Sequence, residues 1–200
     1  MIRSLMITIV IAWCHTANAE DSWSTDPTDF INHFTAVAIE DILTADISDV
    51  EKRKRFRKLF RDGFDIPAIG RFVLARNWRR ADDSEKQSFV ALFEDVIVYT
   101  WSRRFSEYDG QEVNILGTAP DGKTGTLVLS EIVDDMGQSA SVQWRLRQRQ
   151  GGLRIVDIIV EGVSMAITYR QDYASVMRQF GGLDGLISQL RAQISSLEKS

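Results

Sequence analysis

The chain has 200 residues, of which 44% are hydrophobic and 26% are charged, and its formal net charge is -4. This negative charge argues against general nucleic-acid binding, which depends on Lys and Arg neutralising phosphates. The single cysteine, Cys14, and one of the two histidines, His15, precede residue 20. The rest of the chain therefore offers His33 alone for histidine chemistry and no thiol for a zinc site, a disulfide or a cysteine nucleophile.

Residues 1–19 have the pattern of a secretory signal peptide. One arginine precedes a short apolar run, and Ala17 and Ala19 form the small-x-small pattern after which signal peptidase cleaves. We expect an exported protein that begins at Glu20, with residues 20–200 as a single domain. The apolar run is shorter than the roughly 18 residues of a spanning helix, and no later segment approaches that length. We therefore expect no stable membrane insertion.

Three aspartates mark predicted helix starts in the first half of the chain. Asp26 precedes a proline and an apolar face, and Asp65 precedes a short helix with Pro67 in its first turn. Asp82 with Glu85 has the spacing of a capping box at the start of a long helix. The aromatic and aliphatic residues of that long helix recur at helical spacing, which is typical of a core stripe.

A strongly basic helix is expected from Ser48 to Gly63. It contains the sequence "EKRKRFRKLFR", with seven basic residues. Phe56, Leu59 and Phe60 form one apolar stripe, so the basic side chains are expected to point outward. The outward face is either an ordinary solvated surface or a docking patch for an acidic partner or anionic headgroups.

After Gly110 the hydrophobic period changes from that of a helix to that of a strand. Turn sequences "PDGK", "DDMGQ" and "GG" separate four runs with strand character. The four predicted strands cover residues 111–118, 124–133, 139–150 and 153–162. Ser164 then caps another helix, and Gly181 precedes a last one. We predict an α+β fold in which a twisted four-stranded antiparallel sheet is wrapped by N- and C-terminal helices.

The stretch "IVDIIVEGVSMAITYR" at residues 155–170 places two carboxylates in an apolar run. Asp157 and Glu161 are either a catalytic acid and base, or markers of the corner where the last strand becomes a helix. On the structural interpretation, Asp157 is expected to pair with Arg154 or Arg170. Periodicity alone does not distinguish a filled core from a lined pocket.

Several segments together resemble the MlaC family, also called the toluene-tolerance family. They are Phe64-Asp65, Leu74 with Trp78, "EGVS" at residues 161–164, and Tyr169-Arg170. The resemblance covers roughly residues 27–195. The chain departs from the family pattern in four places, which bear on cavity shape and lipid preference more than on the fold. They are Ala75 in place of glycine, Trp101 in place of tyrosine, Leu153 in place of tryptophan and Tyr173 in place of phenylalanine.

The resemblance implies a periplasmic carrier of glycerophospholipids that shuttles them between the inner and outer membranes, as part of a pathway of outer-membrane lipid asymmetry. It implies an apolar cavity within the fold, with no catalytic residues, no metal and no cofactor. The side chains expected to line the cavity are Val73, Leu74, Trp78, Phe93, Val96, Ile97, Trp144, Val156, Ile158, Val160, Val163, Met165 and Tyr169.

The implied partners are an inner-membrane lipid-transport complex and an outer-membrane complex of a lipoprotein with a porin. We expect Arg53, Arg55 and Arg57 to contribute a docking surface for one of them. Two alternatives remain open at this stage. A related branch of the family carries hopanoids, and a curled sheet with helices can also house a small enzyme in which an apolar pocket raises the pKa of a carboxylate such as Asp157.

Overall fold

The computed structural model describes residues 23–199, so the expected signal peptide lies outside the described residues. The first half of this part is helical, and the α-helices there are α1 Pro27–Ala38, α2 Asp49–Gly63, α3 Ile66–Leu74 and α4 Asp83–Ser102. The sheet follows, formed by β1 Glu112–Asp121, β2 Gly125–Val133, β3 Ser139–Arg149, β4 Gly152–Val160 and β5 Val163–Ser164. Two helices end the chain, α5 Met165–Gln179 and α6 Leu183–Leu197. The α+β class is as predicted.

The sheet is an antiparallel meander with the strand order β1-β2-β3-β4-β5. It contains the four predicted strands and one more, the two-residue strand β5, which is too short to leave a periodic signal. β4 and β5 are joined by Glu161 and Gly162, whose φ angles are 48° and 77°. Positive φ at both central residues is the geometry of a type I′ turn, which matches the twist of a hairpin.

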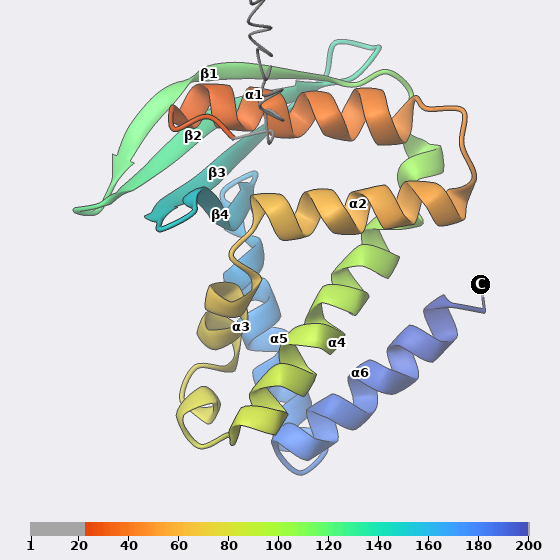
Figure 1. Cartoon of the computed structure of the whole chain (residues 1–200), viewed down its shortest axis with the longest axis vertical. Helices are drawn as coiled ribbons and strands as arrows, with labels where there is room; N and C mark the ends of the chain where they lie inside the picture. The colour runs from red at the N-terminus through yellow and green to blue at the C-terminus, as the bar shows by residue number, and fades with distance from the viewer. Residues whose placement is uncertain (1–22, 200) are drawn as a thin grey trace, which may run out of the picture.

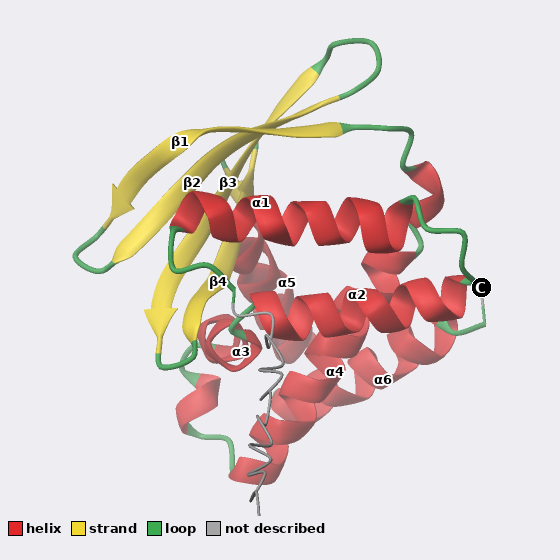
Figure 2. Ribbon diagram, turned by 45° about the horizontal axis from the view of Figure 1, so that its top comes forward, coloured by secondary structure: helices red, strands yellow, loops and turns green. Residues whose placement is uncertain are grey.

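Helices cover one side of the strongly twisted sheet, as Figures 1 and 2 show. α1 packs against β1 and β2, and α2, α3 and α5 contact β4. α4 packs against α2 and α6, further from the sheet. The sheet and the helix layer thus form two walls that meet along β4.

The predicted helix starts are confirmed. Asp26, Asp65 and Asp82 each accept hydrogen bonds from backbone N–H groups in the first turn of the following helix, and the box formed by Asp82 and Glu85 is complete. Such caps satisfy donors that have no partner inside the helix. Ser48 and Glu51 have the same capping-box spacing at the start of α2, but only half of that box forms. The Ser48 hydroxyl accepts from the backbone N–H of Glu51, whereas the Glu51 carboxylate pairs with Lys54 and Arg55 one turn on.

The ends of two helices could not be predicted from their hydrophobic periodicity. α1 continues into a π-helical segment, Ile39–Leu43, before the chain turns. α3 stops at Leu74 because Ala75 adopts φ 51° and ψ -119°, and a 3-10 helix at Asn77–Arg79 follows. The sequence predicts a short helix over residues 66–78, and the α-helix ends four residues earlier, at Leu74.

The strand periodicity matches the burial. In β3, Val142, Trp144 and Leu146 are buried and face the helices, whereas Gln143 and Arg145 between them are half-buried on the other face. β1 forms the long free edge of the sheet. Its register is interrupted by a bulge between residues 115 and 117, and a proline stands near its end, at residue 120.

None of the helices within residues 23–199 is long and apolar enough to cross a membrane.

The backbone at Ala75 generates a stability prediction. A non-glycine residue with these angles carries strain of about 1–3 kcal/mol, which glycine avoids. We expect Ala75→Gly to raise the free energy of unfolding by about 1 kcal/mol, despite the added entropy of the unfolded chain. Chemical denaturation measures this, with the exposed helical residue Ala91 as the control. Ala91→Gly is expected to lower stability by about 1 kcal/mol, and a loss of stability in both variants would contradict the prediction.

Candidate functional site

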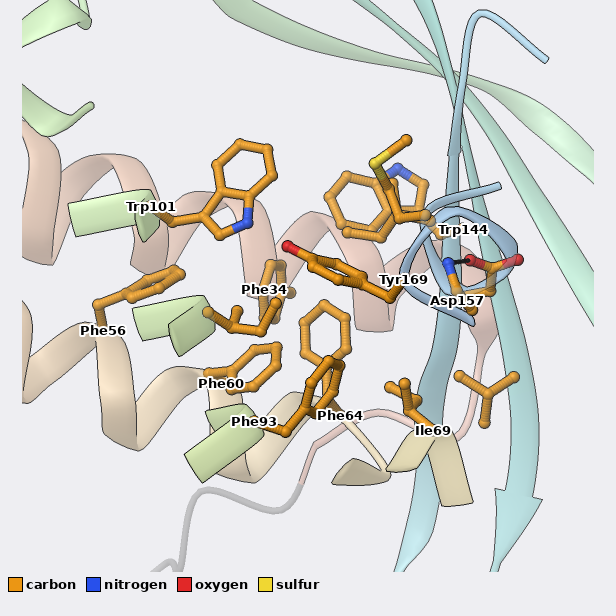
Figure 3. A pocket seen from close by; sticks show the side chains of 15 residues that line it. Phe34, Phe56, Phe60, Phe64, Ile69, Phe93, Trp101, Trp144, Asp157 and Tyr169 are labelled. Atoms are coloured by element: carbon orange, nitrogen blue, oxygen red, sulfur yellow. Dashed lines mark hydrogen bonds between the residues drawn. The ribbon is translucent and has the colours of Figure 1, made fainter. Parts of the chain in front are cut away.

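An apolar cavity of about 220 Å³ lies between the sheet and the helices. Figure 3 shows that aromatic rings from α1, α2, α4 and α5 surround it. Asp157 is the one charged residue among its lining side chains in the described part of the chain. The lining residues are Phe34, Phe56, Phe60, Phe64, Ile69, Phe93, Ile97, Trp101, Trp144, Val156, Asp157, Ile158, Met165, Ala166 and Tyr169.

A second cavity, of about 370 Å³, adjoins the first. The two share the side chains of Phe34, Phe56, Trp101 and Trp144, so these four rings form the partition between them. The second cavity extends along α1 and the π-helical segment, and its lining also includes polar residues. These polar residues are Thr35, Arg104, Glu107, Tyr108 and Gln111, four of them from the connection between α4 and β1.

The aromatic walls are built by residues that contact one another. The ring centroids of Phe60 and Phe64 lie 4.4 Å apart, and the Phe34 ring meets Trp144 at 5.7 Å in an edge-on arrangement. Edge-on and tilted pairs of this kind are favourable beyond the area they bury. The Trp144 indole also donates to the hydroxyl of Ser130, so its polar edge is satisfied inside the sheet. The walls are thus held in place by contacts outside the cavity as well as within it.

A bulge in β4 directs the strand's side chains toward the cavity. Ile155 pairs with Leu146, but Asp157, two residues on, pairs with Arg145, so Val156 is the extra residue. After the bulge Ile158 stands opposite Trp144 on the face of the helices, because directly paired residues share a face of the sheet. The bulge also places Asp157 on the same face as Arg145.

Asp157 is 5% exposed and all its hydrogen bonds are structural. One carboxylate oxygen accepts from the Arg145 guanidinium at 2.7 Å and from the Ser164 hydroxyl at 2.6 Å. The other accepts from the backbone N–H of Ala166 at 2.9 Å, the bond dashed in Figure 3. A carboxylate at the first turn of α5 also meets the positive end of the helix dipole.

The prediction that Asp157 pairs with Arg154 or Arg170 was wrong. Arg154 donates instead to the backbone carbonyls of residues 151 and 153, and Arg170 stacks on the Phe72 ring. Arg145 is the partner because it lies directly across the strand pair, a relation that depends on the bulge.

Glu161 also has a structural role. Its carboxylate accepts from the backbone N–H of Ser141, and its own N–H donates to the Ser141 carbonyl at 2.9 Å. The Ser164 hydroxyl accepts from the N–H of Ile167, which makes it the N-cap of α5 as predicted. The corner interpretation of this stretch therefore agrees with every polar contact its two carboxylates make.

Two tyrosines of α5 lie near the cavity in different settings. Burial raises the pKa of the Tyr169 phenol, and the nearby Trp101 indole N–H, which favours the phenolate, only partly offsets this. The Trp101 indole nitrogen and the Tyr169 hydroxyl point toward each other in Figure 3. Tyr173 lies deeper, edge-on to Phe89 and Phe93, and burial raises its pKa further. Within the described residues its hydroxyl has no hydrogen-bond partner.

The model of the family described as "MlaC protein" matches residues 34–192. The chain belongs to the MlaC family. A solved structure of the phospholipid-binding protein from Ralstonia solanacearum, in complex with a phospholipid, superposes with a TM-score of 0.72 at 18% identity. That match covers 83% of this chain and 97% of the Ralstonia chain. The similarity establishes that the described elements have the MlaC fold.

The structure brings seven of the side chains predicted to line the cavity to its wall, namely Phe93, Ile97, Trp144, Val156, Ile158, Met165 and Tyr169. It places the others elsewhere. Val73, Leu74 and Val96 are buried in the core beside the cavities, and Val160 is half-buried against it. Val163 is 53% exposed, and Trp78 lines a separate hollow on another side of α3.

The residues that the prediction missed come mostly from the N-terminal helices. Phe34, Phe56, Phe60 and Phe64 line the first cavity. The periodicity of the first three indicated only a buried stripe, and Phe64 was noted only as part of the family resemblance. A filled core and a cavity wall use the same residue types, so periodicity alone could not have separated them. Trp101 had a distinguishing signal, because the sequence already marked it as a departure that bears on cavity shape.

The three arginines predicted to dock a partner all have contacts within the chain. Arg57 donates to Glu94 at 2.7 Å and to Asp95 at 2.6 Å, which ties α2 to α4. Arg53 stacks on the ring of Tyr99, and Arg55 donates to the backbone carbonyl of residue 41. Residues 23–199 contain no cluster of three or more His, Cys, Asp or Glu side chains suited to a metal ion.

Replacing Asp157 tests whether its hydrogen bonds stabilise the turn from β4 into α5. Asp157→Asn keeps the shape but leaves the buried side of Arg145 without its charge partner, so we expect unfolding free energy to fall by about 2–3 kcal/mol. The loss of stability is not expected to be larger, because Arg145 is partly exposed and keeps Asp121 as a second charge partner. Thermal or urea unfolding measures the change, with exposed Asp172→Asn as the control. Equal stability of the two variants would contradict the structural role.

Removal of the unpaired Tyr173 hydroxyl is expected to raise the free energy of unfolding, whereas replacement of Asp157 lowers it. Tyr173→Phe removes a buried polar group without a partner, so stability is expected to rise by about 1 kcal/mol. Tyr169→Phe is the comparison, because the Tyr169 hydroxyl points toward the Trp101 indole nitrogen and its removal is expected to bring no such gain. Urea unfolding of the two variants separates them, and a destabilised Tyr173→Phe protein would show that the hydroxyl has a partner after all.

Proposed function

We propose that this MlaC protein is a periplasmic carrier that encloses the acyl chains of a glycerophospholipid and moves the lipid between the inner and outer membranes. The observation that carries the proposal is the pair of adjoining cavities, the first almost wholly apolar and the second lined by both apolar and polar side chains. A molecule with long apolar chains and one polar end matches that distribution. The phospholipid bound to the Ralstonia protein of the same fold supports the assignment.

The need for such a cavity follows from the energetics of lipid transfer. Two sixteen-carbon chains have about 30 methylenes, and exposing them to water costs roughly 24 kcal/mol at about 0.8 kcal/mol each. A protein with an apolar interior removes this barrier without any chemical step. Since the Asp157 carboxylate is engaged by Arg145, Ser164 and Ala166, we propose no catalytic role for it.

The headgroup is proposed to lie at the polar part of the second cavity. Arg104 stacks beside Trp101, with its guanidinium 5.8 Å from the ring centroid, and Glu107 and Gln111 follow on the same connection. This mixture of positive, negative and neutral groups is not selective for one headgroup charge. We therefore propose that the protein accepts lipids with different headgroups.

Release into a membrane requires partners, because a cavity that binds tightly empties slowly. We propose an inner-membrane lipid-transport complex and an outer-membrane lipoprotein-porin complex, and we retain α2 as a docking surface. Arg53 and Arg55 remain candidates there, together with Lys54 and Lys58, whose side chains are 79% and 80% exposed. Arg57 is the weakest candidate because its charge is already paired with two carboxylates.

Native mass spectrometry of protein purified from the periplasm without detergent tests the proposal. We expect about one glycerophospholipid per protein, identified by mass spectrometry of the organic extract. A hopanoid in the extract would transfer the assignment to the related branch of carriers. An empty protein that also takes up no lipid from vesicles would refute the carrier function.

A pair of matched substitutions connects the bound lipid to the cavity. Ile158→Trp places extra bulk at the cavity wall, and overpacking costs about 1–3 kcal/mol, so lipid binding is expected to weaken by about ten- to a hundredfold. Val163→Trp adds the same indole at an exposed position a few residues away. It is expected to leave bound lipid unchanged. Equal lipid content in the two variants would place the ligand outside this cavity.

A further inference from the structure

A hollow of about 560 Å³ lies beside α3 and α5, and four arginines line it. Arg71 comes from α3, Arg76 and Arg79 come from the segment after α3, and Arg170 comes from α5. Phe72 and Trp78 contribute aromatic side chains to the lining. α3 and α5 are in contact, and Figure 1 shows them side by side below the sheet. We refer to this feature as the arginine hollow.

The backbone after α3 brings these arginines together. The helix ends at Leu74, the chain reverses at Ala75, and the 3-10 helix at Asn77–Arg79 follows directly. Ala75 itself lines the hollow with its positive φ of 51°. Strained backbone of this kind persists where the surrounding structure requires it and is common at binding sites.

The arginine hollow has no carboxylate to balance its charge. No Asp or Glu is among its lining residues, and no ion pair within residues 23–199 involves Arg71, Arg76, Arg79 or Arg170. The basic helix α2 differs, since five of its seven cations pair with acids of α2 or α4: Lys54, Arg55, Arg57, Lys58 and Arg61. In a chain with a net charge of -4, four like charges around one hollow repel one another, and a partner of opposite charge would relieve this repulsion.

Apolar groups are exposed among these charges. Phe72 is 42% exposed, and the Arg170 guanidinium stacks on its ring at 5.1 Å. Arg170 also lines a neighbouring hollow that includes Arg178 and Ile167, the latter 46% exposed. Arginine and aromatic residues side by side are enriched at protein interfaces, where they provide much of the binding energy.

We propose that the arginine hollow docks an acidic segment of a partner protein. The carboxylates of that segment pair with the planar guanidinium groups, which suit bidentate recognition, and an apolar side chain packs on Phe72 and Trp78. The occupant is a polypeptide because the hollow combines guanidinium groups with the exposed ring of Phe72, so acidic and apolar side chains of one segment can contact it together. The proposal does not depend on which lipid occupies the cavities.

Isothermal titration with a synthetic peptide tests this. The probe is a twelve-residue peptide that alternates glutamate with leucine, titrated into the full-length mature protein at low and physiological salt. The double variant Arg76→Ala/Arg79→Ala is expected to bind about tenfold or more weakly, because two charge-assisted contacts are lost. The matched control, Arg80→Ala/Arg191→Ala, removes the same charge from exposed positions outside the hollow and is expected to bind like the parent protein.

Stability and membrane binding are measured on the same proteins. The side chains of Arg76 and Arg79 are exposed and make no ion pair in the described part of the chain, so the double variant is expected to unfold at the parent's midpoint or above it. Absence of peptide binding, or equal weakening in both double variants, would overturn the proposal. So would binding to phosphatidylglycerol vesicles that requires Arg76 and Arg79 in the absence of peptide binding, since the occupant would then be a lipid surface.

Discussion

The buried carboxylate of Asp157 contacts three elements at once: a guanidinium on β3, a hydroxyl on β5 and the first turn of α5. A charged group this deep is tolerated only when all its acceptor sites are used. These bonds fix where the sheet ends and at what point α5 departs from it. Since Met165, Ala166 and Tyr169 on α5 form one wall of the first cavity, the cavity's shape depends on this corner.

Local sequence signals predicted most of the fold because they act over short distances. Aspartates before helices, glycine turns and the alternation in β3 each determine structure within a few residues. The features that were missed depend on contacts between distant segments. The bulge at Val156 arises from the pairing of β3 with β4, and the pairing of Arg145 with Asp157 follows from it. Neither is encoded in the strand itself.

The candidate site was predictable only in part, for a different physical reason. Residues of α4, α5 and β4 such as Phe93, Tyr169 and Ile158 could be identified because the family resemblance located them. The aromatic side chains of α1 and α2 could not, because hydrophobic burial selects the same residues whether the space beside them is filled or empty. The position of Val163 shows the converse, since an apolar residue next to the corner faces solvent.

The long free edge of the sheet bears on the aggregation of the protein. An edge strand offers unpaired backbone groups to any other strand, which makes it a template for aggregation. β1 is interrupted by the bulge between residues 115 and 117 and lacks an N–H group at Pro120. A neighbouring chain could therefore form only short runs of hydrogen bonds along it. Disrupting the corner at Asp157 would leave this protection in place, because β1 lies at the opposite end of the meander from β4 and β5.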